Sequence, residues 1–448
     1  DFQVQSVVSS AWYTLTAANL AEGPHCIVYA DQNKVVSKAA AQRLVTEYEE
    51  KIYPPLERVF GAPPDIDGNG KVILLLLDIL DGYTPAGSGY VAGYFSSYHM
   101  MKSNAVYPHS NEADMLFLDI YPGEIGSDTF YATIAHELQH LIDFGKTSAR
   151  EMNRDIWINE GLSLSAEYLY GGQRPDRIDL YDEANAYGLG LPWGNNFFVW
   201  NGYWEREKGD SLSNYVTAYL FFQWLRIQAQ GTGIYTAISD AVKGEGFGDY
   251  RDVTAAAATV NDAFADWPVL LGSWMLANWY NNERGVFGYR GEITLTEKYV
   301  LSPAQSGDSY ALFPGEGVFS PRGGTSYSPQ GNIRYYGVSG EASAAPADPT
   351  AGFFEGSSQT GPYLLTFNGN SSTGGGSEPG SLGVPVAQAG LSRSSPDAGV
   401  VSLRSSGRAV SPAPPLGPYP VGLGDKLAGH GDTPRPVGFE EARTKGGR

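Results

Sequence analysis

Residues 127–145 read SDTFYATIAHELQHLIDFG, and apolar side chains recur in this stretch every three or four positions. This spacing predicts a helix with one apolar face, with Ser127 as its N-cap and Gly145 just past its end. The stretch also contains the pattern H-E-x-x-H. Because residues four apart lie on the same side of a helix, His136 and His140 can present their ring nitrogens to one metal ion.

The residue types in this pattern point to zinc chemistry. Catalytic zinc is bound by imidazole nitrogen and carboxylate oxygen, and it lowers the pKa of a bound water toward 7. Glu137 directly follows the first histidine, so its carboxylate is expected beside that water and can accept a proton during attack on a carbonyl. We therefore predict Glu137 as the general base.

A catalytic zinc site usually has three protein ligands and one open position. Glu160, in the segment WINEGLS at 157–163, lies on a second predicted helix that runs roughly from Asp155 to Tyr170 and stops at a pair of glycines. The connection between the two helices is long enough for the chain to turn back toward the first. We predict Glu160 as the third ligand.

The chain before this helix pair predicts mixed α and β structure. Residues 38–60 carry one apolar helical face and predict a helix that ends near Pro54. The apolar run KVILLLLDIL at 71–80 predicts a strand buried on both faces. GYVAGYFSSY at 89–98 and DMLFLDIY at 114–121 predict two more strands.

The hydrophobic pattern changes several times along the chain from helix-like to strand-like spacing. The expected fold class is therefore α+β. Apolar helical stretches at 213–230 and 262–280 follow the helix pair, then short Tyr/Val/Leu runs between Gly and Pro predict strands, and a stretch rich in Gly, Pro and Ser ends the sequence. The expected parts are an N-terminal mixed α/β subdomain (1–125), active-site helices with a helical subdomain (126–285), a small β-rich module (286–370) and a low-complexity tail (371–448).

Composition excludes several classes of function. The 448 residues carry 49 acidic and 30 basic side chains, a net charge of −19, and so lack the basic footprint that nucleic-acid binding needs. The single cysteine, Cys26, excludes intrachain disulfides and multi-cysteine metal sites. No apolar run approaches the roughly 20 residues of a membrane helix. The chain begins at Asp1 without a methionine, which is consistent with an exported protein trimmed of its signal peptide.

The motif region resembles a known group of enzymes. It resembles the gluzincin clan of metallopeptidases in that HELQH is followed after nineteen residues by the Glu of NEG. It is most similar to the hyicolysin family of secreted bacterial metallopeptidases in the wording AHELQHLIDF and WINEGLSLSAEYLYGG. The resemblance implies a zincin-like catalytic domain. It implies His136, His140 and Glu160 as zinc ligands and Glu137 as general base.

One position departs from the pattern of the clan. Thermolysin-like enzymes continue NExxSD, and that Asp orients the first ligand histidine, but Leu164 occupies the matching place here. A ligand histidine normally donates its other N–H to a carboxylate or carbonyl. Asp143, near the ligand face of the first helix, is our candidate, and Glu167 is a weaker one. A solvated helix carboxylate remains the alternative for Asp143.

The tetrahedral intermediate of peptide hydrolysis needs a donor for its oxyanion. Tyr215 lies at about the distance from the ligand Glu at which metalloaminopeptidases of the clan have a catalytic Tyr. Tyr219 is on the same helical face and competes for the role. Since the chain has 29 tyrosines, packing remains an alternative for both.

The segment DIDGNGK at 65–71 resembles a D-x-D-G-N-G calcium loop. Asp65, Asp67 and Asn69 could supply oxygens, and the glycines permit the turn. The twelfth position is Leu76 rather than Glu, which excludes a standard EF-hand. A calcium site would have to be completed by another acidic residue, and an Asx/Gly turn before the strand is the favoured interpretation.

These features together predict a monomeric zinc metalloendopeptidase that is secreted or placed at the cell surface or periplasm by bacterial-type export. Its partners would be proteins or peptides, and an edge strand within 114–121 would pair with extended substrate. A metalloaminopeptidase is one alternative, although the G-x-M-E-N strand of that family is not found upstream. A surface adhesin or binding protein that retains the fold is another, and the complete set of His, Glu, His and Glu argues against it.

Overall fold

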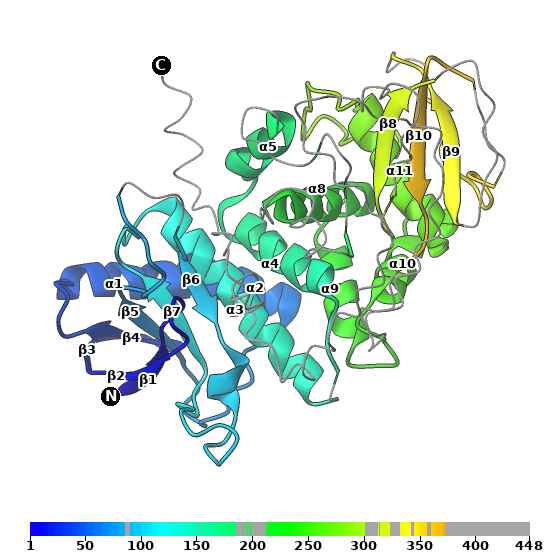
Figure 1. The fold of residues 1–448 in the computed structure, drawn as a ribbon. Coiled ribbons are helices and arrows are strands. Elements are labelled where there is room, and N and C mark those ends of the chain that lie inside the picture. Colours follow the sequence, from blue (N-terminus) through cyan, green and yellow to red (C-terminus); the bar gives the residue numbers. More distant parts are fainter. Residues whose placement is uncertain are drawn as a thin grey trace, which may run out of the picture. The chain divides into compact units, whose positions relative to one another are not determined.

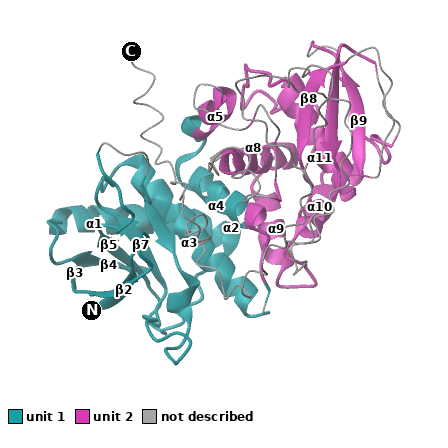
Figure 2. Ribbon diagram, viewed as in Figure 1, with its two compact units in different colours: residues 1–152, 159–176, 415–448 teal, residues 153–158, 177–414 magenta. Residues whose placement is uncertain are grey.

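The structure is a computed structural model that describes residues 1–85, 90–150, 152–184, 191, 195, 197–198, 212–300, 312, 314–322, 332–341, 345–355 and 360–371. The described residues form two compact units, coloured separately in Figure 2. The first unit contains residues 1–152 and 159–176, and the second contains 153–158 and the described residues from 177 onward. Both helices and sheets are present, so the predicted α+β class is confirmed.

The first unit is built on a five-stranded sheet with the strand order β3-β4-β5-β7-β6 (Figure 1). The three inner strands run parallel, and each outer strand is antiparallel to its neighbour. The strands are β3 (Ala17–Glu22), β4 (Cys26–Asp31), β5 (Val72–Leu77), β6 (Gly93–Phe95) and β7 (Met115–Asp119). A separate hairpin pairs β1 (Phe2–Gln5) with β2 (Trp12–Leu15).

The central strand β5 confirms the strand predicted from the longest apolar run. All of its residues are buried. Side chains alternate between the two faces of a strand, and Ile73 and Leu75 belong to the core that includes Val4 and Leu15 of the β1–β2 hairpin. On the helical side of the sheet, α1 packs against β3 and β4, and α3 packs against β6 and β7. Cover on both faces explains the unbroken apolar sequence.

The helical segment at 38–60 does not end near Pro54, contrary to the prediction. The chain forms α1 (Lys38–Glu47), a π-helical turn η1 (Tyr48–Ile52) and α2 (Tyr53–Phe60). Pro54 and Pro55 lie in the first turn of α2. A proline is tolerated there because the first backbone N–H groups of a helix have no partner within it.

The helix predicted around H-E-x-x-H is α3 (Asp128–Ser148), and Ser127 caps it by accepting the N–H of Phe130 at 3.1 Å. Gly145 lies inside this helix, so its predicted place past the helix end is wrong. A Cβ at this position would lie 2.9 Å from Pro64. The glycine therefore permits close packing of the helix and does not end it.

The strands predicted at 89–98 and 114–121 are present in shorter form as β6 and β7, and a 3-10 turn, η2 (Ser97–Met100), follows β6. Because β7 lies between β5 and β6, the expectation of an edge strand within 114–121 is wrong. All residues of β7 are buried, as an inner strand requires. The edges of this sheet are β3 and β6.

The second unit combines helices with a three-stranded antiparallel sheet of order β8-β10-β9. Helix α4 (Ile156–Gly171) begins in this unit and belongs to the first unit from Asn159 onward. The other elements are α5 (Pro175–Asp182), α8 (Leu212–Ala229), α9 (Gly233–Ala241), α10 (Tyr250–Ala258), η4 (Asp262–Ala265), α11 (Trp267–Tyr280), β8 (Gly317–Pro321), β9 (Ile333–Val338) and β10 (Tyr363–Asn368). The predicted tail (371–448) lies outside the described residues except for its first residue, Ser371.

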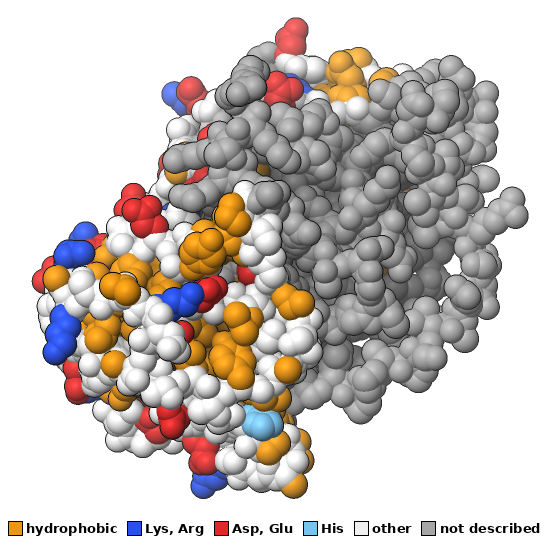
Figure 3. Space-filling model, turned by 60° about the vertical axis from the view of Figure 1, so that its left-hand side comes forward, with side chains coloured by type: hydrophobic (Ala, Val, Ile, Leu, Met, Phe, Trp, Pro, Cys, Tyr) orange, Lys and Arg blue, Asp and Glu red, His pale blue; other side chains and the backbone are white. Residues whose placement is uncertain are grey.

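Two features concern the outside of the molecule, namely the charged side chains on its surface and the hydropathy of its helices. On the face shown in Figure 3, acidic and basic side chains of the described residues lie mostly around the rim, with apolar side chains between them. Within the described ranges, no helix is both long enough and apolar enough to cross a bilayer.

Candidate metal centre

Three side chains of metal-binding type converge inside the first unit. His136 and His140 project from α3, and Glu160 projects from α4. The two Nε2 atoms are 3.1 Å apart, and Oε2 of Glu160 lies 3.2 Å from Nε2 of His136 and 3.5 Å from Nε2 of His140. All three residues are buried. The structure thus brings the three predicted ligands to one point.

The geometry and the donor types of this group fit zinc. Ligand atoms about 2.1 Å from a tetrahedral ion are about 3.4 Å from one another, close to the three separations. Although Oε2 of Glu160 is buried and faces both rings, it makes no hydrogen bond within the described part of the chain. This oxygen lies within ion-pair distance of both imidazoles, and a buried carboxylate is favourable only opposite positive charge, which a bound cation supplies. Two imidazoles and one carboxylate also leave a fourth position open.

The opposite nitrogen of each imidazole is bound to an oxygen. Nδ1 of His136 lies 2.9 Å from Oε1 of Glu167, and Nδ1 of His140 lies 2.6 Å from Oδ1 of Asn159. Oγ of Ser163 is also 3.0 Å from Nδ1 of His140. Because these oxygens accept an N–H from Nδ1, the Nε2 lone pair of each ring is free to bind a metal.

The partners of Nδ1 differ in part from the residues considered in the sequence. Glu167, the weaker of the two candidates, is the residue that orients His136. Asp143 is buried on the same helix, and its role stays a prediction. Asn159 is absent from the predicted set because the thermolysin-like pattern places the orienting side chain after the ligand Glu. The Asn of NEG, directly before Glu160, was the available signal.

Glu137 is held beside the group by the main chain of an edge strand. Its Oε2 accepts the backbone N–H of Phe95, the last residue of β6, at 2.8 Å. Burial raises the pKa of the Glu137 carboxyl above its usual value. A raised pKa makes the carboxylate a stronger proton acceptor, as a general base requires.

The charges around the group favour a cation. Burial alone would lower the pKa of His136, but the carboxylates of Glu160 and Glu167 and the charge of Glu137 outweigh burial and raise this pKa to about 10. Burial acts in the opposite direction on Glu160, where the two imidazoles nevertheless hold the pKa of the carboxyl well below its usual range. A divalent ion can supply the positive charge that these carboxylates stabilise.

Two further sets of predicted residues are not members of this group. Tyr215 is half-buried on α8 in the second unit, and Tyr219 on the same helix is fully buried. The predicted role of Tyr215 at an oxyanion stays a prediction. Asp65 and Asp67 lie in the turn before β5 and are grouped with Asp114.

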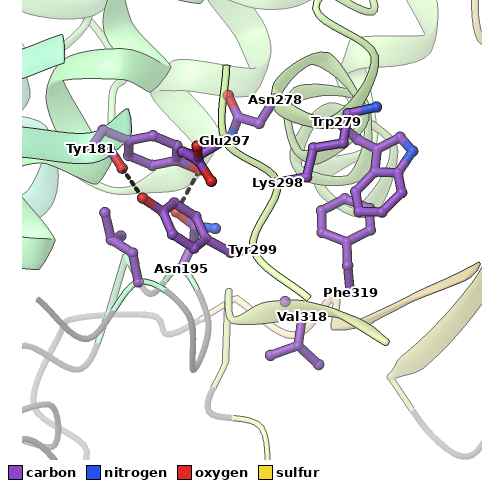
Figure 4. Close-up of a pocket in the computed structure, with 11 residues that line it drawn as sticks. Tyr181, Asn195, Asn278, Trp279, Glu297, Lys298, Tyr299, Val318 and Phe319 are labelled. Atoms are coloured by element: carbon purple, nitrogen blue, oxygen red, sulfur yellow. Dashed lines mark hydrogen bonds between the residues drawn. The ribbon is translucent and has the colours of Figure 1, made fainter. Parts of the chain in front are cut away.

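A pocket in the second unit is too small for a peptide (Figure 4). Its volume is about 20 Å³, which is room for roughly one water molecule. The hydroxyl of Tyr181 donates to Oδ1 of Asn195 at 3.2 Å, and the hydroxyl of Tyr299 donates to the carbonyl of Tyr181 at 2.8 Å. These bonds join the walls of the pocket, and its side chains do not belong to the metal-binding group.

Comparison with known proteins agrees with this geometry. The chain is 32% identical over 226 residues to the neutral metalloprotease ShpI of Staphylococcus hyicus. The chain is thus similar to a metalloprotease. The matched segment covers 48% of this chain and 48% of ShpI, so the chain spans about half the length of this relative. No family model matches. The resemblance to an H-E-x-x-H metallopeptidase is confirmed by this identity together with the grouping of His136, His140 and Glu160.

The contact between Asn159 and His140 leads to a testable expectation. Asn159→Ala should weaken zinc binding by about 10- to 100-fold, because Nδ1 of His140 loses the nearer of its two oxygen partners and keeps only Oγ of Ser163. Competition with a chromophoric chelator measures this affinity. Asn19→Ala, at an exposed position of β3, is the matched control and should bind zinc like the wild type. Equal zinc affinity in both variants would contradict a positioning role for Asn159.

Proposed function

We propose that this chain is a zinc-dependent metalloendopeptidase that is exported and hydrolyses proteins or peptides. The observation that carries the proposal is the convergence of His136, His140 and Glu160, with Glu137 held alongside. The similarity to a neutral metalloprotease over about half of the chain supports it. Zinc is favoured over other divalent ions by the mixed imidazole and carboxylate ligands.

A zinc ion held by these three residues would polarise the substrate carbonyl and lower the pKa of a water molecule. Glu137 would accept a proton from the attacking water and return it to the leaving amine. Since Oε2 of Glu137 accepts the N–H of Phe95, Oε1 is the oxygen left to carry this proton. The hydrogen bond also fixes the orientation of the carboxylate before substrate arrives.

The edge strand β6 is the proposed docking element for an extended substrate. Phe95 directs its N–H away from β7 and toward Glu137. Gly93, two residues earlier, presents its backbone groups in the same direction because strand residues alternate. A Cβ on Gly93 would lie 2.9 Å from Thr133 of α3, so the glycine allows the catalytic helix to approach the edge. A substrate backbone could add to this edge by main-chain hydrogen bonds.

The proposal predicts a metal-dependent endopeptidase. The purified full chain should hold about one zinc ion, and 1,10-phenanthroline should abolish cleavage of casein, with activity restored by added zinc. Peptides with blocked N-termini should be cleaved internally, because an endopeptidase does not need a free amine. Cleavage confined to peptides with free N-termini would favour an aminopeptidase, and proteolysis that survives complete removal of zinc would refute the proposal.

A further inference from the structure

A second group of carboxylates lies in the first unit, at one end of the central sheet. Asp65 and Asp67 belong to the turn that precedes β5, and Asp114 directly precedes β7. Strands β5 and β7 are parallel neighbours, so the residues before them meet at the same end of the sheet. One carboxylate oxygen from each of the three residues lies within 4.8 Å of the other two.

Asp114 is the unusual member of this group, because it is buried with only 1% of its surface exposed. Its Oδ2 accepts the backbone N–H of Ile66 at 2.6 Å. Its Oδ1 is buried and has no hydrogen-bond partner among the described residues. Leaving a buried carboxylate oxygen unpaired is unfavourable. The carboxylate of Asp114 therefore lacks one partner, and it is one of the three carboxylates grouped here.

The local charges do not supply that partner. Lys71 follows the turn directly, but its ammonium group is paired with Glu22. Burial, together with the negative charges of Asp67 and Asp65, raises the pKa of the Asp114 carboxyl to about 6. Three carboxylates that repel one another and surround a common point are the environment that a hard cation stabilises.

We propose that Asp65, Asp67 and Asp114 together bind one calcium ion. Calcium takes six to eight oxygen ligands in flexible geometry, and an exposed turn can complete the shell with backbone carbonyls and water. Magnesium demands a near-ideal octahedron, and zinc prefers nitrogen and sulfur. Asn69 is not needed as a ligand, since its amide donates to Asp67 and its oxygen accepts the N–H of Lys71.

The ion would link the turn before β5 to the start of β7, two segments that are far apart in the sequence. Calcium binding at this point would stabilise the first unit because an ion that binds only the folded state shifts the unfolding equilibrium. At a concentration 100 times the dissociation constant, the gain corresponds to a rise of about 5–10 °C in melting temperature for a unit of this size.

Calorimetric titration of the zinc-loaded full chain with calcium chloride, after removal of loosely bound ions, tests the proposal. We expect saturable binding of about one calcium ion and the stated rise in melting temperature. Asp114→Asn keeps the shape of the side chain and should weaken calcium binding by at least about 10-fold. Asp67→Asn, in the exposed turn, should weaken calcium binding by a similar factor. This variant tests the site even if Asp114→Asn fails to fold. Asp262→Asn, exposed in the second unit, is the control and should behave like the wild type.

Zinc content separates this proposal from the zinc site. Asp67→Asn and Asp114→Asn should retain zinc while they lose the response to calcium. The proposal is wrong if the wild type does not bind calcium at millimolar concentration, if both variants bind it with unchanged affinity, or if magnesium binds as tightly. None of these results would affect the zinc proposal, whose failure would appear as absence of zinc in the wild type.

Discussion

Glu137→Gln is expected to lower kcat by about 10²- to 10⁴-fold while the protein keeps its zinc. The substitution preserves the size of the side chain and its acceptor for the N–H of Phe95, and it removes only the capacity to take up a proton. Because Glu137 lies beside the ligand group and is not part of it, zinc content should stay at the wild-type level. Steady-state kinetics on an internally quenched peptide, with metal analysis of the same samples, measures both quantities.

An exposed glutamate of the same unit provides the control for this substitution. Glu50→Gln, on the surface of η1, should leave kcat and zinc content unchanged. If Glu137→Gln cleaves the peptide at the wild-type rate, the base is another residue. Loss of zinc from Glu137→Gln would show instead that this carboxylate helps to bind the metal.

His140→Ala and Glu160→Gln are expected to remove the zinc itself. Each leaves two of three protein ligands, so zinc content should fall from about one ion per chain to near zero, and peptide cleavage should fall below detection. His140 is completely buried, so its truncation also leaves a cavity and should lower the melting temperature. Glu160→Gln keeps the side-chain volume and separates loss of the metal from loss of packing.

Metal analysis after dialysis, together with the melting temperature, checks this expectation. His25→Ala is the control, because His25 pairs with Glu49 in the same unit and its side chain is 44% exposed. It should keep zinc and activity. Full zinc content in either ligand variant would show that the metal is bound elsewhere in the chain.

The sequence predicted best the features that depend on local spacing. His136 and His140 are four residues apart, and the helix alone places them on one side. The strand β5 followed from an unbroken apolar run, since only cover on both faces of a sheet makes such a run favourable. The role of Glu160 could be predicted because a short connection after the first helix limits where the second helix can lie.

Features that depend on pairing between distant segments could not be predicted in the same way. No local pattern encodes the order of the strands in the sheet, so the residues of 114–121 do not reveal that β7 lies between β5 and β6. Phe95 contributes a main-chain N–H, and such a donor has no signature in the sequence. Asp114 meets Asp65 only because two parallel strands lie side by side.

The bond between Phe95 and Glu137 has a consequence for mutational scanning. A main-chain amide survives almost every substitution, so replacing Phe95 by alanine would report its ring packing against Phe144 and leave the donor in place. Among the genetically encoded residues, only proline deletes the N–H. Side-chain substitutions at position 95 therefore hardly test the N–H that orients the proposed base. An amide-to-ester exchange at this position in a semisynthetic chain would remove that N–H alone.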